Sequence, residues 1–115
     1  MPSSKRPRRV LFICHLNRSR SATAERVFCK HHDLDVRSAG TASDARVQVN
    51  TRMLEWADVI FTMDNTQQEA LERLFPGHPA LPRLICLDIP DDFAFLQPDL
   101  VKLLEDRVAA HLKTV

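Results

Sequence analysis

Apolar and polar positions change in blocks along the chain, and these blocks predict strands that alternate with helices. The uninterrupted apolar run VLFI at 10–13 is typical of a strand buried on both faces. Shorter apolar blocks predict three more strands, and apolar residues at helical spacing predict four helices. The expected strands are 10–13, 34–38, 58–63 and 84–87, and the expected helices are 22–28, 50–56, 64–75 and 98–112.

Helix-capping residues stand where these helices would begin. Ser19 or Ser21 is available to cap the first helix, Asn50 the second, and Asp64 or Asn65 the third. Strands that alternate with helices indicate a parallel sheet with right-handed crossovers. In such a sheet, ligands bind beyond the carboxyl ends of the strands.

Length and composition indicate one globular domain and exclude several classes of protein. With 115 residues and a formal net charge of +1, the chain lacks the basic excess of a dedicated nucleic-acid binder. Its apolar runs are too short to span a membrane. Three cysteines do not make a disulfide framework, so the expected compartment is the cytoplasm. We expect a flexible basic tail over residues 1–8 and a single domain over 9–115.

The polar segment between the first strand and the first helix carries the chemistry. It runs CHLNRSRS from Cys14 to Ser21. If this loop curls into a ring, its successive N–H groups and the helix N-terminus form an anion-binding nest. Arg20 can present its planar guanidinium to two phosphate oxygens. The sequence therefore predicts a phosphate site with Cys14 at its floor.

The same surroundings suit Cys14 for nucleophilic attack. A helix N-terminus and nearby cations favour the thiolate, and a hydroxyl from Ser21 could donate to the sulfur. Asn17 fits a tight ring because asparagine tolerates a positive φ. The alternative is that Cys14 is a small buried hydrophobe at a strand end. We predict that Cys14 and Arg20 are catalytic, and that the phosphate is bound by His15, Leu16, Asn17, Arg18, Ser19 and Ser21.

Motifs in order along the chain resemble the low-molecular-weight protein tyrosine phosphatase family. They are VLFIC at 10–14 with Asn17, Arg20-Ser21 and Ala24-Glu25, then VRSAGT at 36–41, DVIFTMD at 58–64 and DIPD at 88–91. The resemblance implies a phosphatase-I-like fold, in which a four-stranded parallel sheet carries helices on both faces in three α/β/α layers. It also implies a hydrolase that acts on phosphomonoesters, with phosphotyrosine favoured, through a cysteinyl-phosphate intermediate.

The resemblance also implies a general acid. Family members carry an Asp-Pro pair followed by an aromatic residue, and here the local run is DIPDDF at 88–93. Aligning the aromatic residue puts Asp91 at the acid position, with Asp92 in place of the proline. Asp88 is the alternative if the loop shifts in register, and either aspartate could instead be a turn former.

Three departures from the family bear on the site. Leu16 stands where the family usually has glycine, so its Cβ could strain the ring. The chain is short for the family between residues 41 and 63, so we expect an open site with Phe93 or Phe95 as an aromatic wall. Arg18 adds a cation at the rim, which would favour acidic substrates and disfavour phosphoarginine; the alternative is a solvent-exposed arginine without a role.

Neither a metal nor another cofactor is expected, because the histidines lack metal-ligand spacing. The expected partner is a phosphorylated protein or small phosphomonoester, with no nucleic acid or membrane, and the chain is expected to be a monomer or weak dimer. One alternative is a phosphate-binding relative that has lost turnover and acts in recognition or regulation. Another is an RNA- or anion-binding module that uses the tail together with Arg18 and Arg20.

Overall fold

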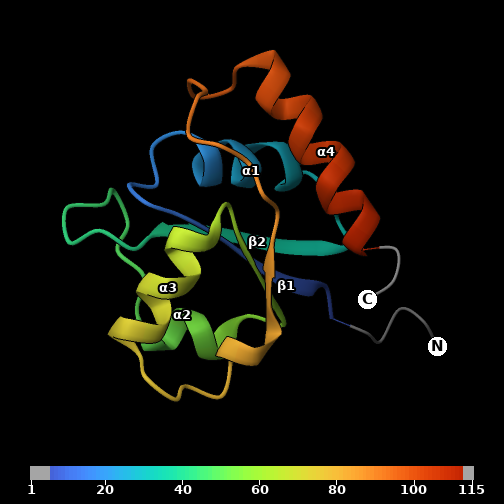
Figure 1. The fold of residues 1–115 in the computed structure, drawn as a ribbon. Helices are drawn as coiled ribbons and strands as arrows, with labels where there is room; N and C mark the ends of the chain where they lie inside the picture. Colours follow the sequence, from blue (N-terminus) through green and yellow to red (C-terminus); the bar gives the residue numbers. More distant parts are fainter. Residues whose placement is uncertain (1–5, 113–115) are drawn as a thin grey trace.

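A computed structural model describes residues 6–112 as a three-layer α/β/α fold (Figure 1). Four parallel strands form one sheet in the order β2-β1-β3-β4. The α/β class, the four strands and their parallel arrangement are as predicted. The strands are β1 (Arg8–Cys14), β2 (Leu34–Gly40), β3 (Val59–Thr62) and β4 (Leu84–Cys86), and the helices are α1 (Arg20–Phe28), α2 (Thr51–Trp56), α3 (Asn65–Leu74), the 3₁₀ helix η2 (Leu81–Arg83) and α4 (Pro98–Leu112).

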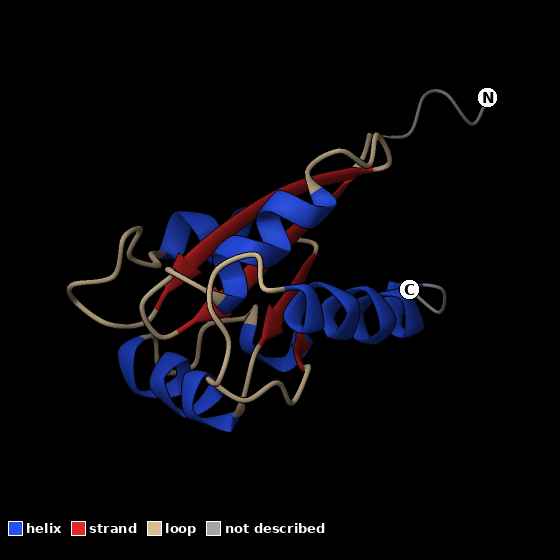
Figure 2. Ribbon diagram, turned by 90° about the horizontal axis from the view of Figure 1, so that it is seen from above, coloured by secondary structure: helices blue, strands red, loops and turns tan. Residues whose placement is uncertain are grey.

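Helices cover both faces of the sheet because β1 is apolar on both sides. Val10 and Phe12 face a core completed by α1 and α4, whereas Leu11 and Ile13 face a core completed by α2 and α3. All four side chains are fully buried. Figure 2 shows the sheet between its helices from above. The uninterrupted apolar run in the sequence therefore corresponds to a central strand with a hydrophobic core on each face.

Local capping signals set the starts of α2 and α3 as predicted. The Asn50 side chain accepts a hydrogen bond from the Met53 N–H at 2.9 Å. Asp64 caps α3 in a capping box with Gln67. The first helix differs, because α1 begins at Arg20 rather than at residue 22. Ser19 occupies the N-cap position of α1 but makes no side-chain cap hydrogen bond.

The amino-terminal boundary also differs from the expectation. β1 begins at Arg8, and Arg6 forms an ion pair with Asp58 at 2.7 Å, so these residues of the expected tail contact the fold. Residues 1–5 of that tail lie outside the described residues. No helix within residues 6–112 has the length and apolar character needed to cross a membrane.

Candidate active site

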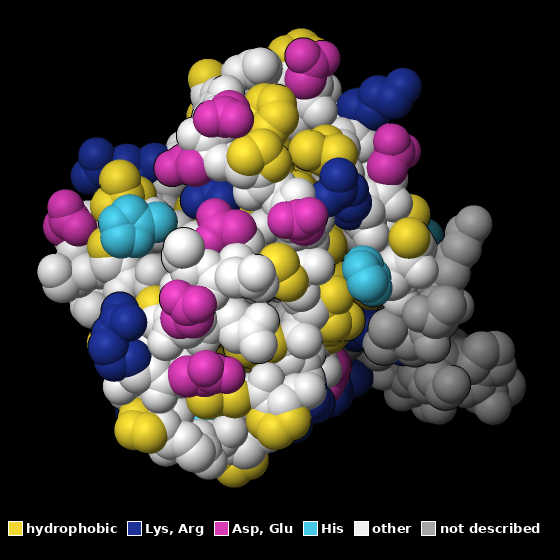
Figure 3. All heavy atoms as spheres, in the orientation of Figure 1, with side chains coloured by type: hydrophobic (Ala, Val, Ile, Leu, Met, Phe, Trp, Pro, Cys, Tyr) yellow, Lys and Arg dark blue, Asp and Glu magenta, His cyan; other side chains and the backbone are white. Residues whose placement is uncertain are grey.

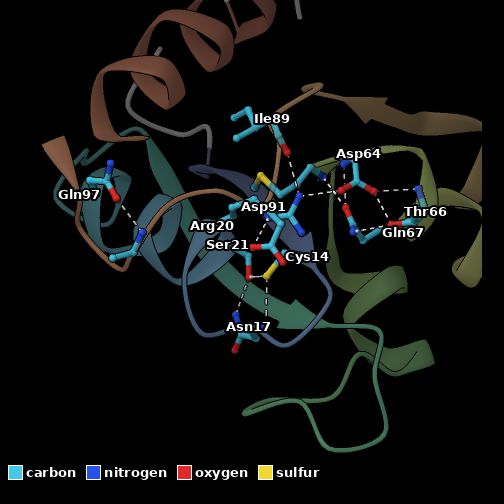
Figure 4. Close-up of polar contacts among 12 residues, drawn as sticks. Cys14, Asn17, Arg20, Ser21, Asp64, Thr66, Gln67, Ile89, Asp91 and Gln97 are labelled. Atoms are coloured by element: carbon cyan, nitrogen blue, oxygen red, sulfur yellow. Dashed lines mark hydrogen bonds and ion pairs between the residues drawn. The ribbon is translucent and has the colours of Figure 1, made fainter. Parts of the chain in front are cut away.

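The loop between β1 and α1 lies at the carboxyl end of the central strand, as the parallel sheet predicts. A pocket of about 60 Å³ opens over this loop. Asp91, from the segment between β4 and α4, completes its lining. Figure 4 shows Asp91 beside Cys14 and Arg20. The pocket is lined by Cys14, His15, Leu16, Arg18, Ser19, Arg20 and Asp91.

Cys14 lies at the buried end of this pocket, with 3% of its surface exposed. Its Sγ accepts a hydrogen bond from the Asn17 N–H at 3.2 Å and lies 2.9 Å from the Ser21 hydroxyl. A cysteine that packed only as a small hydrophobe would not have these polar partners.

Asn17 holds the loop in its ring conformation. Its φ of 58° is in the left-handed region, as predicted. Its side-chain Nδ2 donates to the hydroxyls of Ser21 at 2.7 Å and Ser38 at 2.9 Å. The Ser38 hydroxyl donates to Glu25 at 2.5 Å. A buried polar network thus extends from the Cys14 sulfur to β2 and the outer side of α1.

Leu16 does not strain the ring in the way its Cβ suggested. Its backbone is not among the positive-φ residues of the part of the chain that the structure describes. The Leu16 carbonyl accepts a hydrogen bond from the Arg46 N–H at 3.0 Å, and the Arg46 Nε donates to the Asn17 carbonyl at 2.9 Å. The loop from 41 to 50 therefore supports the ring from outside.

Several main-chain donors of the ring have no acceptor in the part of the chain that the structure describes. The main-chain N–H groups of His15, Leu16, Arg18 and Ser19 donate to no acceptor within residues 6–112. The first-turn N–H groups of a helix have no intrahelical acceptor either, and α1 begins at the end of this loop. The arrangement can therefore bind an anion with main-chain donors and the positive end of the helix dipole.

Arg20 is the buried cation of the site, with 2% of its surface exposed. Its Nη1 donates to Asp64 at 2.7 Å and to the Ile89 carbonyl at 2.8 Å. Its Nε is buried and has no hydrogen-bond partner among the described residues, and Asp91 Oδ1 lies 3.6 Å from it. Asp64 and Ile89 thus fix one nitrogen of the guanidinium and leave the others for a ligand (Figure 4).

The electrostatics of Asp64 reflect this role. Partial burial raises the pKa of Asp64, but hydrogen bonds from Thr66 and Arg20 outweigh that effect and lower its pKa from 3.8 to about 2. Asp64 is therefore a carboxylate over the neutral pH range, and its charge offsets that of the buried guanidinium.

Asp91 and Asp88 occupy different environments. Asp91 lines the pocket and its side chain is 65% exposed, so it can reach a bound ligand. Asp88 does not line the pocket. Asp88 has a φ of 58°, and its carbonyl accepts a hydrogen bond from Arg107 at 2.8 Å. These contacts match the turn-forming role that the sequence left open for an aspartate after a strand.

The expected aromatic wall is absent from the pocket. Phe93 packs against the core beneath α1 and α4. Phe95 is 45% exposed and lines a neighbouring groove. The sequence placed these two side chains at the right loop but could not give their directions, because the loop contains no regular element that would fix them. Within residues 6–112, no group of three or more His, Cys, Asp or Glu side chains is placed to hold a metal ion.

Gly40 allows β2 to approach the ring closely. A Cβ at this position would lie 2.5 Å from the His15 carbonyl oxygen and 3.0 Å from the Asn17 nitrogen. Any larger residue would therefore displace the ring or the end of β2. In the sequence, Gly40 was only part of a family motif.

Four supporting residues of the site were not assigned a role from the sequence. Glu25 lies in α1, whereas Ser38, Arg46 and Asp64 come from segments outside the loop and α1. Only Asp64 carries a signal in the sequence, because it stands just after a strand that pairs with β1. The sequence predicted Asp64 only as a helix cap. These residues are Glu25, Ser38, Arg46 and Asp64.

Comparison with solved structures identifies the fold. The YwlE arginine phosphatase from Geobacillus stearothermophilus aligns at a TM-score of 0.72 with 24% identity, over 94% of each chain. A low-molecular-weight protein tyrosine phosphatase from Streptococcus pyogenes aligns at 0.77 with 17% identity, over 94% of this chain and 93% of its own. The tyrosine phosphatase Wzb from Escherichia coli K30, in complex with phosphate, aligns at 0.73 with 18% identity, over 93% of this chain and 97% of its own.

The chain has the fold of the low-molecular-weight protein tyrosine phosphatases. The resemblance that its motifs predicted is therefore confirmed for the fold. The alignments cover nearly the whole of both chains, so the similarity extends beyond the loop. No protein-family model matches the sequence, and no curated protein sequence matches it.

Proposed function

We propose that the chain is a cysteine-dependent phosphatase that hydrolyses phosphomonoesters, with phosphotyrosine as the favoured substrate. One observation carries the proposal: the hydrogen-bonded Cys14 sulfur, the fixed Arg20 guanidinium and the Asp91 carboxyl share one pocket. The structural neighbours support it, since they include a tyrosine phosphatase in complex with phosphate.

In the first step the Cys14 thiolate attacks the phosphorus. The Arg20 Nε and free Nη2, with the unpaired N–H groups of the loop, bind the three non-bridging oxygens as charge develops on them. The phosphorus–oxygen bond to the leaving group breaks, and Asp91 gives its proton to the departing oxygen. The product is the dephosphorylated substrate and a cysteinyl phosphate.

In the second step water releases the phosphate. Asp91, now a carboxylate, accepts a proton from the water as the water oxygen attacks the phosphorus. The sulfur–phosphorus bond breaks, inorganic phosphate leaves, and the Cys14 thiolate is regenerated. Asn17 and Ser21 act through the sulfur, because their hydrogen bonds hold it as the leaving group of this step.

Phosphotyrosine is favoured over phosphoarginine within this proposal because Arg18 lies at the rim of the pocket and forms no ion pair within residues 6–112. A guanidinium leaving group would meet a like charge there, which is unfavourable. The similarity to an arginine phosphatase makes phosphoarginine the substrate to compare.

The test is hydrolysis of p-nitrophenyl phosphate in EDTA by the wild type, Cys14→Ser and Cys29→Ser. We expect Cys14→Ser to lose all measurable turnover while it stays folded and binds phosphate. Cys29 is exposed at the end of α1, so Cys29→Ser should retain full activity and serves as the matched control. Full activity in Cys14→Ser would refute the mechanism. A folded wild type that binds phosphate without turnover would instead support the recognition-only alternative.

The RNA-binding alternative receives no support from the position of Arg20. That hypothesis needs Arg20 at the surface, whereas its side chain is 3% exposed and paired with Asp64. As part of the same proposal we place the activity in the cytosol, because the mechanism needs a free thiol. Cys14, Cys29 and Cys86 form no disulfide.

A further inference from the structure

The catalytic pocket is too small to hold more than the end of a substrate. Its volume is about 60 Å³, whereas ligand sites usually measure roughly 300–1,000 Å³. The rest of a substrate must therefore lie over the rim. Two larger grooves adjoin the pocket there, one through Arg18 and the other through His15.

The groove next to Arg18 is rich in arginine, and we call it the arginine groove. Its volume is about 530 Å³, and its lining includes the apolar side chains of Ala22 and Phe95. Phe95 belongs to the same segment as Asp91 and is 45% exposed. The charged residues that line the groove are Arg18, Arg26, Arg46 and Glu25.

Within residues 6–112, two of these arginines have no partner for their charge. Glu25 accepts a hydrogen bond from Ser38, and its carboxylate lies 3.9 Å from the Arg46 guanidinium. The charges of Glu25 and Arg46 therefore offset one another. Arg18 and Arg26 form no side-chain hydrogen bond or ion pair with the rest of the described chain, 6–112. The groove therefore presents unneutralised positive charge beside the catalytic pocket.

The groove on the other side of the pocket has the opposite balance. It measures about 560 Å³, and its lining includes Asp44 and Glu69 with a single arginine, Arg73. Figure 3 shows Lys and Arg side chains at the upper left of the molecule, over the loop that joins β1 to α1 in Figure 1. A substrate lying across the rim thus meets a basic groove on the Arg18 side and a more acidic one on the His15 side.

We infer that the arginine groove binds acidic side chains, aspartate or glutamate, that flank the phosphorylated residue of a peptide substrate. The inference rests on the proposed phosphatase function and names its substrate class. Charge complementarity selects the occupant, since carboxylates carry the charge opposite to that of the unpaired guanidinium groups. The exposed ring of Phe95 adds an apolar surface to the same groove.

The experiment compares two phosphotyrosyl peptides that differ only in their flanks, three glutamates in one and three glutamines in the other. The variants are Arg26→Glu, Arg26→Lys and, as a control with the same charge change on α2, Arg52→Glu. Arg26 lies outside the catalytic pocket, so turnover of p-nitrophenyl phosphate should be the same in all of them.

For the wild type we expect kcat/KM to be about 10-fold higher for the acidic peptide, since exposed charge pairs contribute modestly and two unpaired arginines line the groove. Arg26→Glu should remove most of this preference through KM, whereas Arg26→Lys and Arg52→Glu should retain it. The preference should also fall as salt rises.

Equal kcat/KM for the two peptides, with normal turnover of p-nitrophenyl phosphate, would overturn the inference and leave the proposed function intact. If Arg26→Glu and Arg52→Glu lost the preference for the acidic peptide equally, the inference would also be overturned. The overall charge of the protein, and not the arginine groove, would then explain the preference. Stronger inhibition by a short RNA than by the unphosphorylated acidic peptide would assign the groove to another partner. Absence of turnover on every substrate would refute both the function and the inference.

Discussion

Replacing Asp64 with asparagine separates the two roles of this residue. Its Oδ2 pairs with Arg20 at 2.7 Å, and its Oδ1 accepts the Thr66 N–H at 2.8 Å at the start of α3. Asparagine retains an oxygen for the helix cap, since Asn and Asp are about equally good N-caps. It removes the negative charge opposite the buried guanidinium, and it places an amide NH2 donor where Oδ2 accepted the Arg20 hydrogen bond.

The contribution of the Asp64 carboxylate to the free energy of unfolding follows from its pKa, which is lowered from 3.8 to about 2. Each unit corresponds to roughly 1.4 kcal/mol, so the carboxylate stabilises the fold by about 2 kcal/mol at neutral pH. Because the pKa in the folded state is depressed, this contribution is fully present above pH 4. It falls to roughly half at pH 3 and is largely lost as the pH passes through about 2. Because the side chain is 30% exposed, solvent screens part of the interaction with Arg20.

The assay is urea unfolding of the wild type, Asp64→Asn and Asp64→Ala at pH 7, 5 and 3. We expect Asp64→Asn to lower the free energy of unfolding by about 2 kcal/mol at pH 7 and by roughly half as much at pH 3. Asp64→Ala should lose about 1 kcal/mol more at every pH, because it also removes the cap. If the free energies of unfolding of the wild type and Asp64→Asn differed by the same amount at pH 7 and at pH 3, the reasoning would be refuted.

Two other substitutions test the geometry of the site. Gly40→Ala should lower the free energy of unfolding by about 1–3 kcal/mol and abolish turnover, since its Cβ would lie 2.5 Å from the His15 carbonyl oxygen. The control is Gly77→Ala, whose added Cβ would meet open space at a φ of 75°, so it should affect stability alone. Normal turnover in Gly40→Ala would contradict the close approach of β2 to the ring. Asp91→Asn should reduce kcat about 10²- to 10⁴-fold on phosphotyrosine and less on p-nitrophenyl phosphate, whose leaving group needs less help from an acid. The matched variant Asp88→Asn should leave kcat on both substrates unchanged. If Asp88→Asn lowered kcat and Asp91→Asn did not, Asp88 would be the general acid.

Much of the fold follows from short segments of the sequence. The apolar run at 10–13 requires burial on both faces, which only a central strand with helices on each side provides. The caps at Asn50 and Asp64 are local interactions, so the starts of α2 and α3 could be predicted to within a residue. The positive φ of Asn17 was predictable for the same reason.

Boundaries and supporting contacts were harder to predict. α1 begins at Arg20 because polar side chains there are buried against partners from other segments, which a hydropathy pattern does not reveal. The directions of Phe93 and Phe95 depend on the packing of an irregular loop against α1 and α4. The tertiary structure also decided between Asp91 and Asp88 for the lining of the pocket.

The sequence by itself determined the order of the elements and the loop at the end of β1, because both depend on residues close together in the chain. Only the tertiary structure brought Asp64 and Ile89 to Arg20, Ser38 to Asn17, and Arg26 and Arg46 to one groove. Such contacts join segments separated by tens of residues. Their geometry depends on how strands pair and helices pack, which no local pattern encodes.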